Sequence, residues 1–290
     1  MSRLILITGA STGVGLAIAK RLLANGTDRL VLTARPESLL RFEEAGLFPS
    51  ERVFLRALDV TNAEQRRAVI DECETALGGL DVLINNAGIS MRSVAEHVND
   101  DDRLAQMDIN FRSPMELTRL ALPGMRSRRR GRIINVSSVG GMMAMPTMSV
   151  YSASKFALEG ACEALWYEVR PWGIFVTLVE PGFINSDGFE KIRWTEMGAQ
   201  SREDPNSPYH AHYRNMTTFI ARIMRRVPAT PDSVAKTVER QINRRSPPLR
   251  KPATFDAWAF AMLRRILPRR LYHLVLYRSL PKIKEWGPRD

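Results

Sequence analysis

Six short apolar runs alternate with longer segments of helical composition, and this rhythm constrains the fold more than any other feature. Each run has the length of a buried strand. Alternating strands and helices favour a parallel, doubly wound sheet with helices on both faces. We therefore expect one α/β domain over residues 1–254, with strands at Leu4–Thr8, Leu30–Ala34, Val53–Ala57, Val82–Ile84, Ile133–Val136 and Phe175–Val179, and a weaker edge strand within 249–254.

The predicted helices fill the gaps between these strands. Thr61 is expected to cap the second helix, and Thr230 the last. In a doubly wound sheet, ligands bind at the carboxyl ends of the strands, so the residues after each strand are the site candidates. The expected helices are Leu16–Ala24, Asn62–Leu77, Leu104–Arg128, Val150–Arg170 and Pro231–Arg245.

The first strand ends in a glycine-rich turn, Thr8-Gly9-Ala10-Ser11-Thr12-Gly13-Val14-Gly15, directly before a predicted helix. Glycines in such a turn let backbone N–H groups approach a pyrophosphate at the helix N-terminus. The second strand leads into Arg35, where dinucleotide sites for NAD carry a carboxylate. An arginine there accommodates a 2′-phosphate, so Arg35 favours NADP(H). The other interpretation is a solvated arginine at a strand end.

Polar residues also follow the fourth strand. In Asn85-Asn86-Ala87-Gly88, the two amides can bind neighbouring backbone, and the small residues allow a ring to approach closely. An asparagine-rich turn without a ligand is the alternative interpretation. Asn110 lies inside a predicted helix, where asparagine is mildly unfavourable. It is either an exposed residue or one that bonds across a broken turn.

Tyr151 and Lys155 are four residues apart and therefore share one helix face. An ammonium beside a phenol is expected to lower the pKa of the tyrosine from ~10 toward working pH. A proton donor and acceptor is most useful there. Ser138 follows the fifth strand and is expected to bring a hydroxyl to the same place. These side chains suit carbonyl–alcohol interconversion, provided that a hydride carrier binds opposite.

Together these motifs resemble the short-chain dehydrogenase/reductase family over about residues 3–190. Asn110, Ser138, Tyr151 and Lys155 match the family's catalytic tetrad in order. Asp59 resembles its adenine contact, and Pro181-Gly182-Phe183-Ile184-Asn185-Ser186 resembles the segment that covers the nicotinamide. The helix around Tyr151 looks most similar to that of hydroxysteroid and retinoid dehydrogenases.

The resemblance implies a Rossmann-like fold, NADP(H) as cofactor, no metal, chemistry at CH–OH groups and a homodimer or homotetramer. It implies substrate contacts at Ser138, Met145, Tyr151 and Phe189. The implied cofactor contacts are Gly9, Ser11, Thr12, Gly13, Val14, Gly15, Arg35, Asp59, Val60, Asn86, Ala87, Gly88, Tyr151, Lys155, Pro181, Gly182, Ile184 and Ser186.

The resemblance also implies a mechanism for the reduction of a carbonyl. Tyr151 would protonate the developing alkoxide, and Ser138 would hydrogen-bond the same oxygen. Lys155 would hold the nicotinamide ribose and lower the pKa of Tyr151. Asn110 would hold a water that links Lys155 to solvent.

Residues 187–230 are expected to cover the substrate, and they are rich in aromatic residues and methionines. Two interpretations stay open: a wall for a bulky apolar substrate, or ordinary packing of two helices. The loop between Ser138 and Tyr151 carries further methionines, which are expected to line the opposite side. A small hydrophobic carbonyl or alcohol is therefore the expected substrate. The loop methionines are Met142, Met143, Met145 and Met148.

Positive charge is concentrated at one end of the chain. The net charge is +11, and residues 222–290 hold 17 Lys/Arg against 5 Asp/Glu, whereas residues 1–221 hold 25 against 26. The chain has two cysteines, Cys73 and Cys162, without metal spacing, and its first apolar run is too short for a signal peptide. We therefore expect a cytoplasmic protein whose basic tail meets something anionic.

Residues 255–290 form a predicted basic, amphipathic extension in which Pro268 separates two short helices. The extension either docks on its own domain or a second subunit, or lies peripherally on an anionic membrane. Nucleic-acid binding is disfavoured because no reader motif accompanies the basic residues. A non-catalytic protein that senses NADP(H) or attaches to membranes through this tail is the alternative function. The presence of all four catalytic residue types favours an enzyme.

Overall fold

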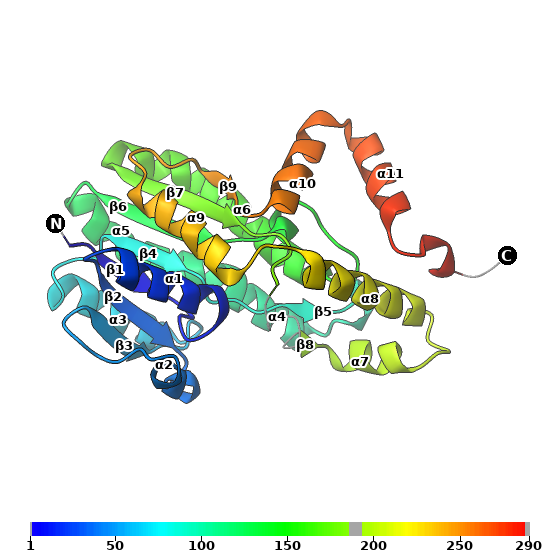
Figure 1. The fold of residues 1–290 in the computed structure, drawn as a ribbon, viewed down its shortest axis with the longest axis horizontal. Helices are drawn as coiled ribbons and strands as arrows, with labels where there is room; N and C mark the ends of the chain where they lie inside the picture. The colour runs from blue at the N-terminus through cyan, green and yellow to red at the C-terminus, as the bar shows by residue number, and fades with distance from the viewer. Residues whose placement is uncertain (1, 186–192, 288–290) are drawn as a thin grey trace.

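The computed structural model describes residues 2–185 and 193–287 and confirms the parallel sheet with helices on both faces (Figure 1). Within these residues the main sheet has seven strands in the order β3-β2-β1-β4-β6-β7-β9. The chain runs outward from β1 to β3 and then returns to the other side of β1, which creates a switch point between β1 and β4. The strands are β1 Leu4–Ile7, β2 Arg29–Ala34, β3 Val53–Ala57, β4 Val82–Asn85, β6 Gly131–Val136, β7 Ile174–Glu180 and β9 Arg250–Pro252.

Two layers of helices cover the sheet, because its central strands are apolar on both faces. All four residues of β1 are fully buried. Side chains of α1 (Gly13–Asn25) and α9 (Pro231–Asn243) pack on one face. On the other face lie α3 (Ala63–Thr75), α5 (Ser113–Ser127) and α6 (Ser149–Val169). The expected edge strand is confirmed as β9, which pairs in parallel with β7.

One of the two predicted helix caps is wrong. Asn62, not Thr61, caps α3, and its Oδ1 accepts a hydrogen bond from the backbone N of Gln65 at 3.0 Å. Thr61 is unavailable because its hydroxyl donates to the Asp59 carboxylate at 2.7 Å. The predicted cap at Thr230 is confirmed and forms a reciprocal capping box with Ser233.

The helix predicted over Leu104–Arg128 is longer and interrupted. It begins as α4 (Asp100–Met107), where Asn99 caps the first turn by accepting from the Asp102 backbone N at 2.7 Å. A π-helical turn, Asp108–Arg112, then precedes α5. Such turns insert one extra residue and are frequent at functional sites. The broken turn considered for Asn110 is therefore present.

The described part of residues 187–230 carries two helices, as one of the two interpretations of this segment supposed. These are α7 (Glu196–Glu203) and α8 (His210–Arg226). They are tied to the domain by a small sheet of β5 (Met91–Arg92) and β8 (Arg193–Trp194). The fully buried Tyr213 also holds α8 to the domain, because its hydroxyl accepts a hydrogen bond from the Val94 backbone N at 3.0 Å. A further short helix, α2 (Leu40–Glu44), follows β2.

The last part of the chain, residues 255–287, forms an arch that stands away from the sheet (Figure 1). It consists of α10 (Phe255–Ile266), α11 (Arg269–Ser279) and the turn η7 (Ile283–Glu285). Pro268 separates the two helices, as predicted. Glu285 pairs with Arg214 of α8 at 3.1 Å, so the far end of this C-terminal arch is held to the domain. None of the described helices combines the length and the apolar character needed to cross a bilayer.

Candidate active site

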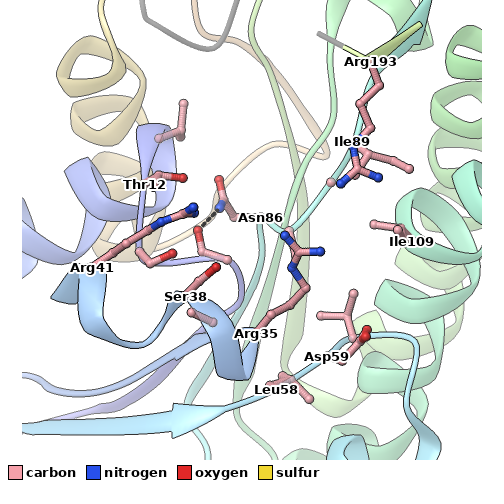
Figure 2. A pocket seen from close by; sticks show the side chains of 17 residues that line it. Thr12, Arg35, Ser38, Arg41, Leu58, Asp59, Asn86, Ile89, Ile109 and Arg193 are labelled. Carbon is pink, nitrogen blue, oxygen red and sulfur yellow. Dashed lines mark hydrogen bonds between the residues drawn. The ribbon is translucent and has the colours of Figure 1, made fainter. Parts of the chain in front are cut away.

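A cavity of about 350 Å³ lies at the carboxyl ends of β1, β2 and β4, at the switch point of the sheet (Figure 2). Ligands of open α/β sheets bind at such points. The cavity also receives side chains that the sequence had not singled out: Ala34, Ser38, Arg41, Leu58, Ile89, Ile109 and Arg193. The sequence-predicted residues that line it are Gly9, Ser11, Thr12, Val14, Arg35, Asp59, Val60, Asn86, Ala87 and Gly88.

The glycine-rich turn depends on two positions, Gly9 and Gly15, at which a larger residue would not fit. Gly9 has a φ of +62°, a backbone conformation that residues with a side chain rarely adopt. A Cβ on Gly15 would lie 2.2 Å from the Gly9 carbonyl oxygen and 2.5 Å from Asn86 Nδ2. That amide donates to the carbonyl oxygens of Thr8 and Gly9, at 3.0 Å each. Gly15 and Asn86 therefore hold the turn in shape, and Gly13 and Gly15 do not line the cavity.

Three arginines converge on the cavity from different elements (Figure 2). Arg35 follows β2 and pairs with Glu37 at 3.1 Å, and about half of its side chain is exposed. Arg41 comes from α2, only six residues after Arg35. That closeness was a usable signal in the sequence. Arg193 arrives on β8, and nothing in its local sequence connects it to the glycine turn.

Asp59 lies at the end of the cavity beside Leu58 and Val60. Its carboxylate accepts from the backbone N of Thr61 at 2.9 Å and from the Thr61 hydroxyl at 2.7 Å. These bonds fix its orientation, and its backbone N donates to Gln65 Oε1 at 2.6 Å. The position suits a contact with the edge of a planar ring.

The structure brings Ser138 and Tyr151 together. Ser138 follows β6, and its Oγ accepts from the backbone N of Gly140 at 3.0 Å. Its hydroxyl also interacts with the phenol of Tyr151, which lies in the first turn of α6, and this interaction lowers the pKa of the phenol. A Cβ on Gly140 would approach the Tyr151 ring to 2.9 Å, so this loop is closely fitted to the phenol.

The expected effect of Lys155 on the pKa of Tyr151 is wrong for this structure. Burial raises the pKa of the Tyr151 phenol above its ordinary value of 10.0, and only the hydrogen bond to Ser138 opposes this. Helical spacing places both residues on one face but does not aim the ammonium at the phenol. The Lys155 Nζ instead donates to the backbone oxygen of Val136 at 3.0 Å.

Lys155 is almost fully buried, and burial lowers the pKa of its ammonium to about 8, although the charge of Glu159 opposes this. Its Nζ faces Gly88, since a Cβ added there would lie 3.9 Å away. The same Cβ would lie 3.2 Å from Asn110 Oδ1. Gly88 also lines the cavity. The cavity and the Lys155–Asn110 pair therefore meet at one residue.

Asn110 is fully buried in the π-helical turn, and its side-chain amide forms three hydrogen bonds within the domain. Nδ2 donates to the Ile89 carbonyl at 2.8 Å and to Ser154 Oγ at 3.0 Å. Oδ1 accepts from the Ile89 backbone N at 2.9 Å. Asn110 therefore binds the backbone just beyond β4, and one lone pair of Oδ1 remains.

The described part of the predicted nicotinamide-covering segment, residues 181–185, does not line the cavity. Its backbone is held by the start of the C-terminal arch: the N–H of Gly182 donates to Thr254 Oγ1 at 2.9 Å, and that of Phe183 donates to Asp256 Oδ2 at 2.8 Å. Pro181 accepts from the Val139 backbone N at 2.7 Å. Ile184 packs against the core on the α1 side. Ser186 and Phe189 lie outside the described residues.

The loop methionines do not all face a substrate. Met142 and Met143 are buried against Ala257 and Tyr272 of the C-terminal arch, so the expectation that they line the pocket is wrong. Met145 packs half-buried against the same cluster. The sequence could not show this burial, because it depends on a tertiary contact with α10, which lies more than a hundred residues further along the chain.

A buried charged cluster that the sequence had not indicated lies behind Lys155. Glu159, one turn further along α6, accepts from the Ser137 hydroxyl at 2.7 Å and pairs with Arg250 of β9 at 3.3 Å. Glu180, at the end of β7, is almost fully buried 3.7 Å from Arg250. Burial, and then the charge of Glu159, raises the pKa of Glu180 to about 8.

Among the described residues, no group of three or more His, Cys, Asp or Glu is arranged to hold a metal.

Replacing Glu180 by glutamine tests this cluster through stability. Because the pKa of Glu180 is about 8 when folded, against 4.5 ordinarily, folding retains a proton that the unfolded chain releases between these values. Wild-type stability should therefore fall as pH rises from about 5 through 8, and Glu180→Gln should lose this dependence, on the order of a few kcal/mol. Thermal melts across this range measure it. Parallel curves for both proteins would mean that Glu180 is ionised when folded.

Comparison with known proteins places these motifs in a defined family. The sequence profile described as short chain dehydrogenase matches residues 3–197. An oxidoreductase named BOA17 from Botryotinia fuckeliana is 34% identical over 90% of this chain and 92% of its own. The human 17-beta-hydroxysteroid dehydrogenase type 1 is 28% identical over 85% of this chain and 76% of its own.

A solved structure supports the same relation. The crystal structure of a variant actinorhodin polyketide ketoreductase with NADPH is 31% identical, with a TM-score of 0.67, and the match covers 83% of this chain and 90% of that one.

Proposed function

This chain belongs to the short-chain dehydrogenase family, and we propose that it is an NADP(H)-dependent oxidoreductase that interconverts a hydrophobic ketone or aldehyde with its alcohol. The observation that carries the proposal is the position of Gly88. It lines the cavity below the glycine-rich turn, and it faces both Lys155 and Asn110. The groups suited to a dinucleotide and those suited to proton transfer are therefore adjacent.

The residues of the cavity fit a nicotinamide dinucleotide. Backbone N–H groups of the glycine-rich turn would bind the pyrophosphate at the N-terminus of α1. Asp59 would contact the adenine, while Arg35 and Arg41 would bind the 2′-phosphate. When bound, NADPH supplies the hydride that reduces a carbonyl carbon. The NADPH in the related ketoreductase structure supports this choice.

Tyr151 would donate the proton that completes the alcohol. Because burial raises the pKa of its phenol, the hydroxyl stays protonated at neutral pH and is ready for carbonyl reduction. Ser138, which interacts with that phenol, would donate to the same substrate oxygen as negative charge develops.

Lys155 and Asn110 would support this transfer from the other side of the cavity. Lys155 would hold the ribose of the cofactor with its ammonium, which points toward Gly88. Asn110 keeps the backbone at Ile89 in place and would bind, through the remaining lone pair of Oδ1, a water that returns protons to Lys155.

The substrate is proposed to be lipophilic, with contacts to Ser138, Met145, Tyr151 and Phe189. Met145 belongs to the apolar cluster beside the Ser138–Tyr151 pair, and thioether side chains adapt to irregular apolar shapes. The similarity to a 17-beta-hydroxysteroid dehydrogenase supports a substrate of this character.

Initial rates with NADPH and NADH against a panel of ketones, aldehydes, sterols and retinoids test the proposal. We expect turnover of lipophilic carbonyls with NADPH and a clear preference over NADH. A preference for NADH would remove the role given to Arg35 and Arg41. Turnover confined to small polar carbonyls would contradict the substrate class.

A further inference from the structure

The outer face of the C-terminal arch is apolar. On α11, Tyr272 is buried toward the loop methionines, whereas Leu271, Leu274 and Val275 point outward and are 44%, 42% and 40% exposed. Their spacing of three and four residues places them on one helix face. Further exposed apolar side chains lie along α10: Phe255, Trp258 and Ile266.

The C-terminal arch is also strongly cationic. Residues 255–287 hold seven Lys/Arg and two Asp/Glu. Both carboxylates are engaged with the domain: Asp256 accepts from the Phe183 backbone N, and Glu285 pairs with Arg214 and Lys282. No carboxylate in the described part of the chain forms an ion pair with the remaining arginines of the arch. Those are Arg264, Arg265, Arg269, Arg270 and Arg278.

This combination selects one kind of partner. Apolar side chains flanked by arginines, at low overall hydrophobicity, are typical of helices that lie in a membrane interface. On an anionic membrane, headgroups would neutralise the arginines, and acyl chains would receive Leu271, Leu274 and Val275. A second copy of this chain would set two cationic faces against each other, which like charges oppose. A nucleic acid would leave the aliphatic side chains exposed to water.

We propose that the C-terminal arch docks the protein on an anionic lipid bilayer through the outward face of α11 and the exposed side chains of α10. Figure 1 shows both helices standing away from the sheet, beside β9 at one end and α8 at the other.

The arch also connects this surface to the candidate active site. Its first turn holds the backbone of Gly182 and Phe183, and α10 and α11 cover Met142 and Met143, just after Ser138. If the proposed function holds, docking places the substrate side of the site near the bilayer, where lipophilic carbonyls accumulate. Docking itself does not depend on turnover.

Vesicle flotation of the full chain tests the proposal. Phosphatidylcholine vesicles are compared with vesicles that also contain phosphatidylglycerol. We expect the protein to float with the anionic vesicles only, and high salt to weaken the binding. The triple variant Leu271→Gln, Leu274→Gln, Val275→Gln should bind about tenfold less or weaker still. Arg269→Gln, Arg270→Gln, Arg278→Gln should also reduce binding, by about a hundredfold.

A matched control replaces exposed leucines by glutamine on the domain instead of on the arch. Leu40 and Leu104 are 70% and 65% exposed on the domain, so Leu40→Gln with Leu104→Gln should float like wild type. Thermal melts identify any variant that fails to fold, and the arginine variant then decides alone. Wild type that stays with the soluble fraction on anionic vesicles overturns the proposal. Arch variants that float like wild type overturn it too. So do arch variants whose only change is a different molar mass by light scattering, because the arch would then be a contact between copies of this chain. Carbonyl turnover is assayed separately, so an inactive protein that floats counts against the proposed function and not against docking.

Discussion

Replacing Tyr151 by phenylalanine is expected to lower kcat by about 10²–10⁴-fold and to leave NADPH affinity unchanged. The substitution removes the only atom of this side chain that can pass a proton, and it keeps the ring that packs beside Gly140. Steady-state rates at saturating NADPH measure the first quantity, and a cofactor fluorescence titration measures the second.

Tyr167 supplies a matched control on the same helix. It lies on α6 but is 64% exposed, so Tyr167→Phe should keep wild-type rates. Retention of most activity by Tyr151→Phe would falsify the proton-donor assignment. A loss of cofactor affinity equal to the loss of rate would instead mean that the ring, and not the hydroxyl, is what the site needs.

Replacing both Arg35 and Arg41 by alanine is expected to lower the preference for NADPH over NADH by about 10²–10⁴-fold. Each guanidinium would make a charge-assisted hydrogen bond to the 2′-phosphate, which contributes about 1.5–3 kcal/mol. Both side chains reach the cavity, one from the end of β2 and one from α2. The ratio of kcat/KM for the two cofactors measures the effect.

The matched control for the arginines is Arg67→Ala, an exposed residue on α3 that does not line the cavity. It should leave the ratio unchanged. Arg35→Asp should go further and favour NADH, because a carboxylate at this strand end binds a ribose 2′-hydroxyl and repels a phosphate. Unchanged selectivity in the double alanine variant would place the phosphate site elsewhere.

The C-terminal arch illustrates what local pattern can and cannot predict. The periodicity of its apolar residues and the position of Pro268 predicted two short basic helices, and both are present. That Tyr272 faces the loop methionines while Leu271 and Leu274 face outward depends on how the arch meets the domain. The same contact explains why Met142 and Met143 are core residues and do not line a substrate wall.

By itself the sequence determined the sheet, the glycine-rich turn and the order of Asn110, Ser138, Tyr151 and Lys155. These follow local rules: strand length, the backbone freedom of glycine, and the spacing of residues on a helix. The tertiary structure alone decided which side chains meet and in what charge state. Arg193 reaches the cavity from a distant strand, and Arg250 meets Glu180 from β9. The pKa of Tyr151 is raised because burial outweighs the interaction with Ser138, and the ammonium of Lys155 donates to the Val136 carbonyl instead, a direction that spacing does not encode.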